Sequence, residues 1–143
     1  MSLLPAALPR QLFGRARVER VIACARVGIA ASSWFAVWLD PAEPARQADF
    51  TYTLHGLYFG YAVLVAAIMW RRDGTGRLPI VTHVGDILAA SVLQYMTLGP
   101  SSPFFTYFVY ALFSAALRWG WQATVRTAVF VLVMYIVMGS RAP

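Results

Sequence analysis

The chain has 143 residues, of which 59% are apolar and only 13% are charged. A soluble domain carries about 25% charged residues, so this composition argues against an ordinary soluble protein and indicates a single membrane domain. All 12 basic residues are arginines, and most lie at the ends of apolar runs, where membrane topology places them. We therefore expect no nucleic-acid binding despite the net charge of +6.

The first predicted transmembrane helix runs from Val21 to Leu39, after a basic N-terminal segment, residues 1–20. Its length gives a rise of about 28 Å, close to the hydrocarbon thickness of about 30 Å. Arg26 lies inside this span, and we expect its long side chain to reach the headgroups. The following "LDPAEPARQAD" contains two prolines and three acids, which predicts an aqueous loop.

The second predicted span runs from Thr53 to Trp70, and aromatic residues near its ends suit the two interfaces. "RRDGTGR" then predicts a short polar turn. The third span runs from Pro79 to Leu98, with its proline in the first helical turn, where the missing N–H costs nothing.

A tight outer turn, "GPSSP", separates the third span from the fourth. We expect Pro100 and Pro103 to set this turn, with Ser102 as the helix N-cap and Pro103 as the first helical residue. The fourth span, Pro103 to Leu117, is short and aromatic, which favours packing and an interfacial belt over a site for an apolar ligand. "RWGWQATVR" follows, with charged Arg118 and Arg126 and with Trp119 and Trp121 suited to a headgroup belt.

The fifth span runs from Ala123 to Gly139, and residues 140–143 form a short tail. The fold class is therefore an all-α, polytopic membrane bundle of about five spans. With the N-terminus inside, two arginines lie outside, Arg46 and Arg141. Nine lie inside, which predicts a cytoplasmic N-terminus: Arg10, Arg15, Arg17, Arg20, Arg71, Arg72, Arg77, Arg118 and Arg126.

His83 and Asp86 are the candidate functional residues, because they lie three apart on one face of the third span. Two roles remain open: a titratable sensing site, or a structural pair facing the bundle and tied to Arg77 or Arg118. Too few ligands lie nearby for a metal. His55 belongs to the opposite membrane face, roughly 20–30 Å away by helix rise, so both histidines cannot ligate one haem. We expect no cofactor.

Three stretches of the sequence together resemble the N-terminal membrane region of bacterial two-component sensor histidine kinases. That region has a "TH…D" helix, a "GPxSPFF" turn and an "RWxWRGT"-like inner loop, and "WLDPAEPAR" resembles its first outer loop. The matching residues are Thr82, His83 and Asp86, then Gly99, Pro100, Ser102, Pro103, Phe104 and Phe105, then Arg118, Trp119, Trp121 and Thr124.

The resemblance implies a multi-pass sensor module in the bacterial inner membrane, working as a homodimer with a kinase or another signalling partner. Such kinases also carry a phospho-accepting histidine segment and an ATP-binding domain, which this sequence lacks. We therefore expect a detached input module without catalytic activity and without the family's sixth span. Two alternatives stay open: a small transporter or accessory subunit of a membrane complex, and a fragment without present function.

Overall fold

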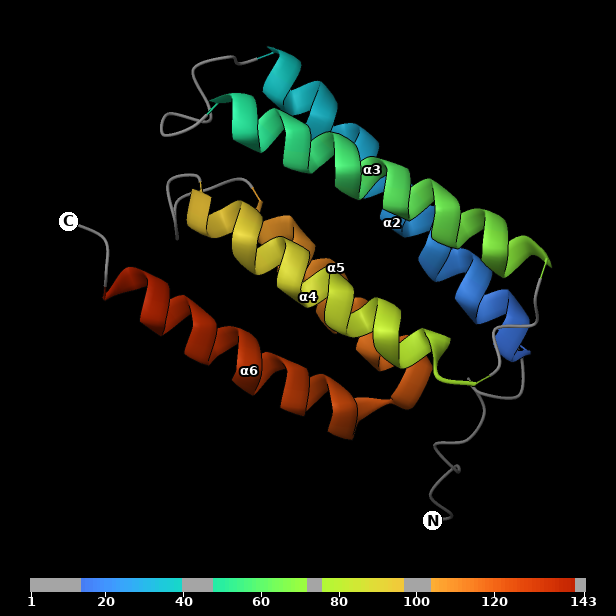
Figure 1. Ribbon diagram of the computed structural model, residues 1–143. Coiled ribbons are helices and arrows are strands. Elements are labelled where there is room, and N and C mark those ends of the chain that lie inside the picture. The colour runs from blue at the N-terminus through green and yellow to red at the C-terminus, as the bar shows by residue number, and fades with distance from the viewer. Residues whose placement is uncertain (1–13, 40–47, 72–75, 97–103, 141–143) are drawn as a thin grey trace.

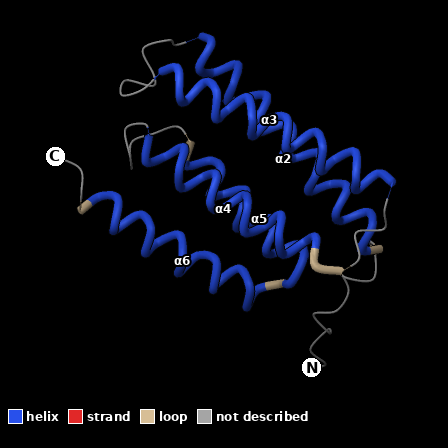
Figure 2. Tube along the Cα trace, viewed as in Figure 1, coloured by secondary structure: helices blue, strands red, loops and turns tan. Residues whose placement is uncertain are grey.

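The computed structural model describes residues 14–39, 48–71, 76–96 and 104–140. These residues form helices and short connections without any strand, so the predicted all-α class is confirmed for this part of the chain (Figure 2). The five helices are α2 (Arg15–Leu39), α3 (Ala48–Arg71), α4 (Leu78–Met96), α5 (Phe105–Trp119) and α6 (Trp121–Gly139).

Consecutive helices run in opposite directions, so α2 begins and α6 ends at opposite ends of the bundle (Figure 1). Helix α2 packs against α3 and α5, and α4 packs against α3 and α5 as well. Helix α6 contacts α5 and α4, and it lies at the edge of the bundle. Four helices therefore surround a common interior, and the fifth is attached from one side.

Two helical segments within the described residues are long and apolar enough to cross a membrane, Phe50–Arg71 and Leu78–Met96. A shorter apolar stretch, Trp121–Val137, lies in α6. Length and composition alone are weak evidence for a bilayer, so the observation supports part of the predicted five-span arrangement.

The helices extend beyond several of the predicted apolar spans. Helix α2 begins at Arg15, well before the predicted Val21, because arginine and glutamate are good helix formers and need no lipid contact. Helix α5 begins at Phe105. The predicted outer turn, with Pro100, Ser102 and Pro103, lies outside the described residues.

One residue, Gly120, separates α5 from α6, whereas five residues separate the predicted fourth and fifth spans. Gly120 has a φ of 79°, in the left-handed region that favours glycine. Its N–H donates to the Ala116 carbonyl at 3.0 Å, and its carbonyl accepts from the Thr124 N–H at 3.2 Å. Trp119 therefore ends one helix and Trp121 begins the next, at a sharp corner.

Apolar packing fills the interior on both sides of a polar layer. The larger core cluster contains alanines, one leucine and aromatic side chains: Ala30, Tyr58, Ala62, Ala90, Leu93, Phe104, Tyr107 and Phe108. A smaller cluster joins α2 to α3 through Ala23, Val65 and Met69. Fully buried alanines such as Ala30 and Ala115 allow helix backbones to approach closely.

Candidate functional site: a buried polar network

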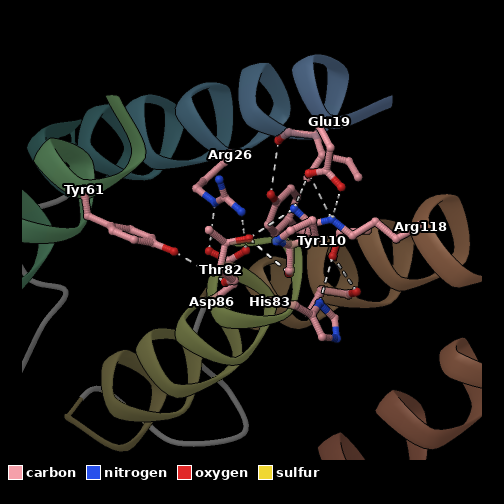
Figure 3. Close-up of polar contacts among 12 residues, drawn as sticks. Glu19, Arg26, Tyr61, Thr82, His83, Asp86, Tyr110 and Arg118 are labelled. Carbon is pink, nitrogen blue, oxygen red and sulfur yellow. Dashed lines mark hydrogen bonds and ion pairs between the residues drawn. The ribbon is translucent and has the colours of Figure 1, made fainter. Parts of the chain in front are cut away.

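The interior of the bundle contains a bidentate ion pair between α2 and α4. Arg26 Nε donates to Asp86 Oδ1 at 2.8 Å, and Arg26 Nη2 donates to Asp86 Oδ2 at 2.7 Å. Both side chains are 1% exposed. The planar guanidinium matches the carboxylate with two parallel hydrogen bonds, so this contact fixes distance and orientation together (Figure 3).

Side chains from α3 and α5 complete the surroundings of this ion pair. The Tyr58 hydroxyl donates to Asp86 Oδ1 at 3.2 Å. The Arg26 guanidinium lies 5.7 Å from the ring centroid of Tyr61 and 5.8 Å from that of Tyr110, within the range of cation–π attraction. Four helices therefore meet around one pair of charges.

A second ion pair lies closer to the end of the bundle where α2 begins. Arg118, near the end of α5, donates from Nε to Glu19 Oε1 at 2.9 Å and from Nη2 to Glu19 Oε2 at 2.8 Å. Nη2 also donates to Thr82 Oγ1 at 3.2 Å, and the Thr82 hydroxyl donates to the Pro79 carbonyl at 3.1 Å. This pair ties α2, α4 and α5 together.

Helix periodicity brings the two ion pairs onto one interior face. Glu19 and Arg26 are seven residues apart, which is about two turns of α2. Thr82 and Asp86 are four residues apart on α4, and they share a face for the same reason. The two positive and two negative charges of these ion pairs give a net charge of zero, because an unpaired charge in a low-dielectric interior is costly.

His83 joins α4 to α5 and α6 through both ring nitrogens. Nδ1 lies 3.1 Å from Ser114 Oγ, and Nε2 lies 3.2 Å from Thr127 Oγ1. The Ser114 hydroxyl donates its single proton to the Ala111 carbonyl at 2.9 Å, so it accepts from His83. A neutral ring with its proton on Nδ1 then accepts from Thr127, and this tautomer satisfies all three groups.

The structure places His83 and Asp86 in the interior, 7% and 1% exposed, but with different partners. Asp86 bonds to α2 and α3, whereas His83 bonds to α5 and α6. The expected tie from this pair to Arg118 is replaced by the Glu19 contact. The expectation that Arg26 reaches the headgroups is wrong, because Asp86 offers a charged partner inside the bundle.

His55 is also buried, 3% exposed, in the half of the bundle opposite Arg118. Its Nε2 lies 3.3 Å from the Tyr107 hydroxyl, and its ring packs against Phe104 with centroids 5.3 Å apart. Within the described residues, no group of three or more His, Cys, Asp or Glu side chains could hold a metal ion. The site is therefore a hydrogen-bonded charge network.

Neither a protein-family model, a curated protein nor a solved structure matches this chain. The likeness to sensor histidine kinases consequently rests on the sequence stretches quoted above.

Proposed function

We propose that the chain is a five-span protein of the bacterial inner membrane that acts as a signal-input module of the two-component type. The arginine asymmetry supports a cytoplasmic N-terminus. Large apolar side chains are exposed on every described helix, which suits a lipid environment. Examples are Phe35 at 58%, Leu57 at 67%, Leu88 at 56%, Val109 at 53% and Leu132 at 59%.

The buried four-helix charge network is the observation that carries a signalling role. A buried ion pair adds little net stability over apolar packing, and charges at membrane depth are costly. Such a network is instead suited to specifying one arrangement of helices among several. A stimulus that alters the Arg26–Asp86 contact would shift α2 relative to α4, and a partner would detect the shift.

Unused hydrogen-bond donors give this network room to change its pairing. Nη1 of Arg26 and Nη1 of Arg118 are both buried without a hydrogen-bond partner in the described part of the chain. Each guanidinium can therefore donate a hydrogen bond to a new acceptor without first losing all of its present hydrogen bonds. Two discrete pairings of the same helices would provide the bistable element that a sensor needs.

The resemblance to sensor kinases adds a homodimer and a cytoplasmic kinase or other signalling partner to this proposal. The module itself carries out no chemistry: it would transmit a change in packing. Arg118 and Glu19 lie toward the predicted cytoplasmic end, where such a change would reach a partner.

Topology is the first test, through reporters active in the periplasm or the cytoplasm and fused after Arg77 and after Pro143. We expect a cytoplasmic signal after Arg77 and a periplasmic signal after Pro143. A cytoplasmic signal after Pro143 would contradict the five-span count.

Signalling is tested by deleting the gene in its own bacterium and restoring wild type, Asp86→Asn or Ser32→Ala. Ser32 is an exposed α2 residue outside the network, so it serves as the matched control. We expect wild type and the control to restore response-regulator phosphorylation, and Asp86→Asn to alter it. Unchanged phosphorylation in the deletion strain, with altered solute uptake, would instead favour a transporter or accessory subunit.

A further inference from the structure

An open hollow of about 530 Å³ lies where α4, α5 and α6 meet, outside the ion-pair network. The first turns of α4 and the residues on both sides of the Gly120 corner line it. These residues include Ile80, His83, Trp119, Gln122, Arg126 and Thr127. The volume lies within the range of about 300–1,000 Å³ that is usual for small-molecule sites.

The lining of this hollow combines a cation with apolar surface. Arg126 is exposed, and none of the lining residues is acidic. His83 uses both ring nitrogens for Ser114 and Thr127, so it forms a satisfied part of the wall. Arg126 and Gln122 are therefore the charged and amide donors that an occupant would meet, beside the Trp119 ring and Ile80.

An exposed apolar stripe leads from the hollow along α4. Ile80, Val84 and Leu88 are 55%, 49% and 56% exposed, and their four-residue spacing places them on one face. This face runs from the hollow toward the middle of the predicted third span. An occupant with a negative head and a long apolar tail would match both parts of the surface.

We propose that the hollow binds the headgroup of an anionic phospholipid from the cytoplasmic leaflet. The proposal rests on the membrane placement proposed above, which puts the corner between α5 and α6 at the inner interface. Arg126 pairs with the lipid phosphate, Gln122 donates to a headgroup oxygen, and one acyl chain lies along Ile80, Val84 and Leu88. Trp119 stands at the headgroup level that amphipathic rings favour.

A bound lipid would bridge α4 and α6 at the place where His83 already joins them. Thr127 and His83 line the hollow and bond to each other across the two helices. The headgroup would contact α6 through Arg126 and Gln122, and its acyl chain would contact α4. Anionic lipid would therefore strengthen the attachment of α6 to the bundle.

The test uses the full chain purified in neutral detergent and titrated with phosphatidylglycerol or phosphatidylcholine, with bound lipid counted by native mass spectrometry. We expect preferential retention of phosphatidylglycerol. A basic side chain contributes about 1 kcal/mol to attraction by anionic lipid, so Arg126→Gln should weaken this binding about fivefold. Arg126→Lys should keep most of the affinity. Arg71→Gln, at an exposed arginine at the end of α3, is the matched control and should change little.

Three outcomes would overturn the proposal: equal losses in Arg126→Gln and Arg71→Gln, equal retention of both lipids, or competition by free inorganic phosphate at the same concentration. The last would identify a site for a soluble anion. Alkaline carbonate extraction of cell membranes separates this failure from failure of the membrane placement. A chain that washes off membranes contradicts the placement, whereas a chain that stays but binds lipid independently of Arg126 contradicts only the lipid site.

Discussion

The four-helix interior and α6 are held by different kinds of contact. Helices α2 to α5 surround two bidentate ion pairs, Arg26–Asp86 and Glu19–Arg118. Among the described side chains of α6, Thr127 alone belongs to the buried set, and it contributes one hydroxyl to His83. Two charged contacts therefore join α2 to α4 and α5, whereas the described part of α6 contributes one buried polar side chain, Thr127, beside its apolar packing.

This difference indicates that α6 detaches from the rest of the bundle at the least cost in stability. Displacing α2 or α4 would leave a charge unpaired in the interior, which is strongly destabilising. Displacing α6 would give up one hydrogen bond of His83 and apolar contacts such as Phe108–Tyr135, with ring centroids 6.4 Å apart. Substitutions in the ion-pair core and in α6 should therefore differ in how much stability they remove and in which helices they loosen.

Asp86→Ala should have the largest effect. The substitution leaves the Arg26 guanidinium buried without its counter-charge and removes the acceptor of the Tyr58 hydroxyl. We expect a loss of about 3–5 kcal/mol in the free energy of unfolding, measured by titration of the purified protein from mild detergent into sodium dodecyl sulfate.

A matched double substitution separates pairing from packing. Replacing both charges, by Arg26→Met with Asp86→Leu, leaves no unpaired charge and should recover most of the stability. The two sites are in direct contact, so the two changes should be strongly non-additive. Additive losses would show that the ion pair does not couple α2 to α4.

Arg118→Ala should have the second largest effect. It leaves Glu19 buried, 5% exposed, and removes the donor to Thr82. Glu19 lies before the predicted start of the first span, where water is nearer, so we expect a smaller loss of about 2–3 kcal/mol. The same detergent titration measures it. A loss equal to that of Asp86→Ala would contradict this difference in depth.

Arg118→Lys checks the geometry of the same contact. Lysine keeps the positive charge but cannot form the bidentate contact with the Glu19 carboxylate. Its stability should fall between wild type and Arg118→Ala. Wild-type stability in the lysine variant would mean that the positive charge alone, without the bidentate geometry of the guanidinium, holds α2 to α5.

The Arg26–Asp86 pair could have been predicted from the sequence. Under the predicted topology the first and third spans rise from the same side of the membrane. Arg26 lies five residues into the first span and Asp86 seven residues into the third, so their depths are similar. A charge at this depth needs a partner. The prediction failed because a long side chain near a membrane surface was expected to reach water.

Two other features could not be read from apolar spans. Glu19 lies in a basic segment that was predicted to end before the helix, and only the continuation of α2 from Arg15 brings it opposite Arg118. The single-residue corner at Gly120 could not be predicted from the sequence, because the tryptophans on both sides are equally compatible with a loop and with a helix end. The number of helices follows from the apolar runs and the turns between them, and the buried face of α4 follows from helix periodicity, whereas contacts between helices depend on how the helices are aligned along one another.

His83→Ala should be weaker than either ion-pair variant. It removes two hydrogen bonds, to Ser114 and Thr127, and the 5.1 Å edge contact with Trp119. We expect a loss of about 1–2 kcal/mol. His55→Ala is the matched control, since His55 is also buried but lies in the other half of the bundle, with its Nε2 3.3 Å from the Tyr107 hydroxyl. Equal stability and equal signalling of the two variants would contradict the special position of His83.

Thr127→Val should have the smallest and most local effect. Valine keeps the shape of threonine but removes the hydroxyl that bonds to His83, the polar contact between α6 and α4. Interhelical hydrogen bonds in membrane proteins contribute about 0.6 kcal/mol on average, so global stability should hardly change. Hydrogen exchange of the α6 backbone should nevertheless accelerate, while α2 to α5 keep their protection.

Thr124→Val is the control for Thr127→Val. It distinguishes the effect of losing the hydrogen bond to His83 from the effect of losing any threonine hydroxyl in α6. The Thr124 hydroxyl donates to the Gly120 carbonyl within the first turn of α6, at 3.1 Å, and holds no second helix. Its substitution should leave exchange in the rest of α6 unchanged. If Thr127→Val instead accelerated exchange equally in all five helices, α6 would belong to the same cooperative unit as the ion-pair core. The detachment of α6 would then not be separable from unfolding of the ion-pair core.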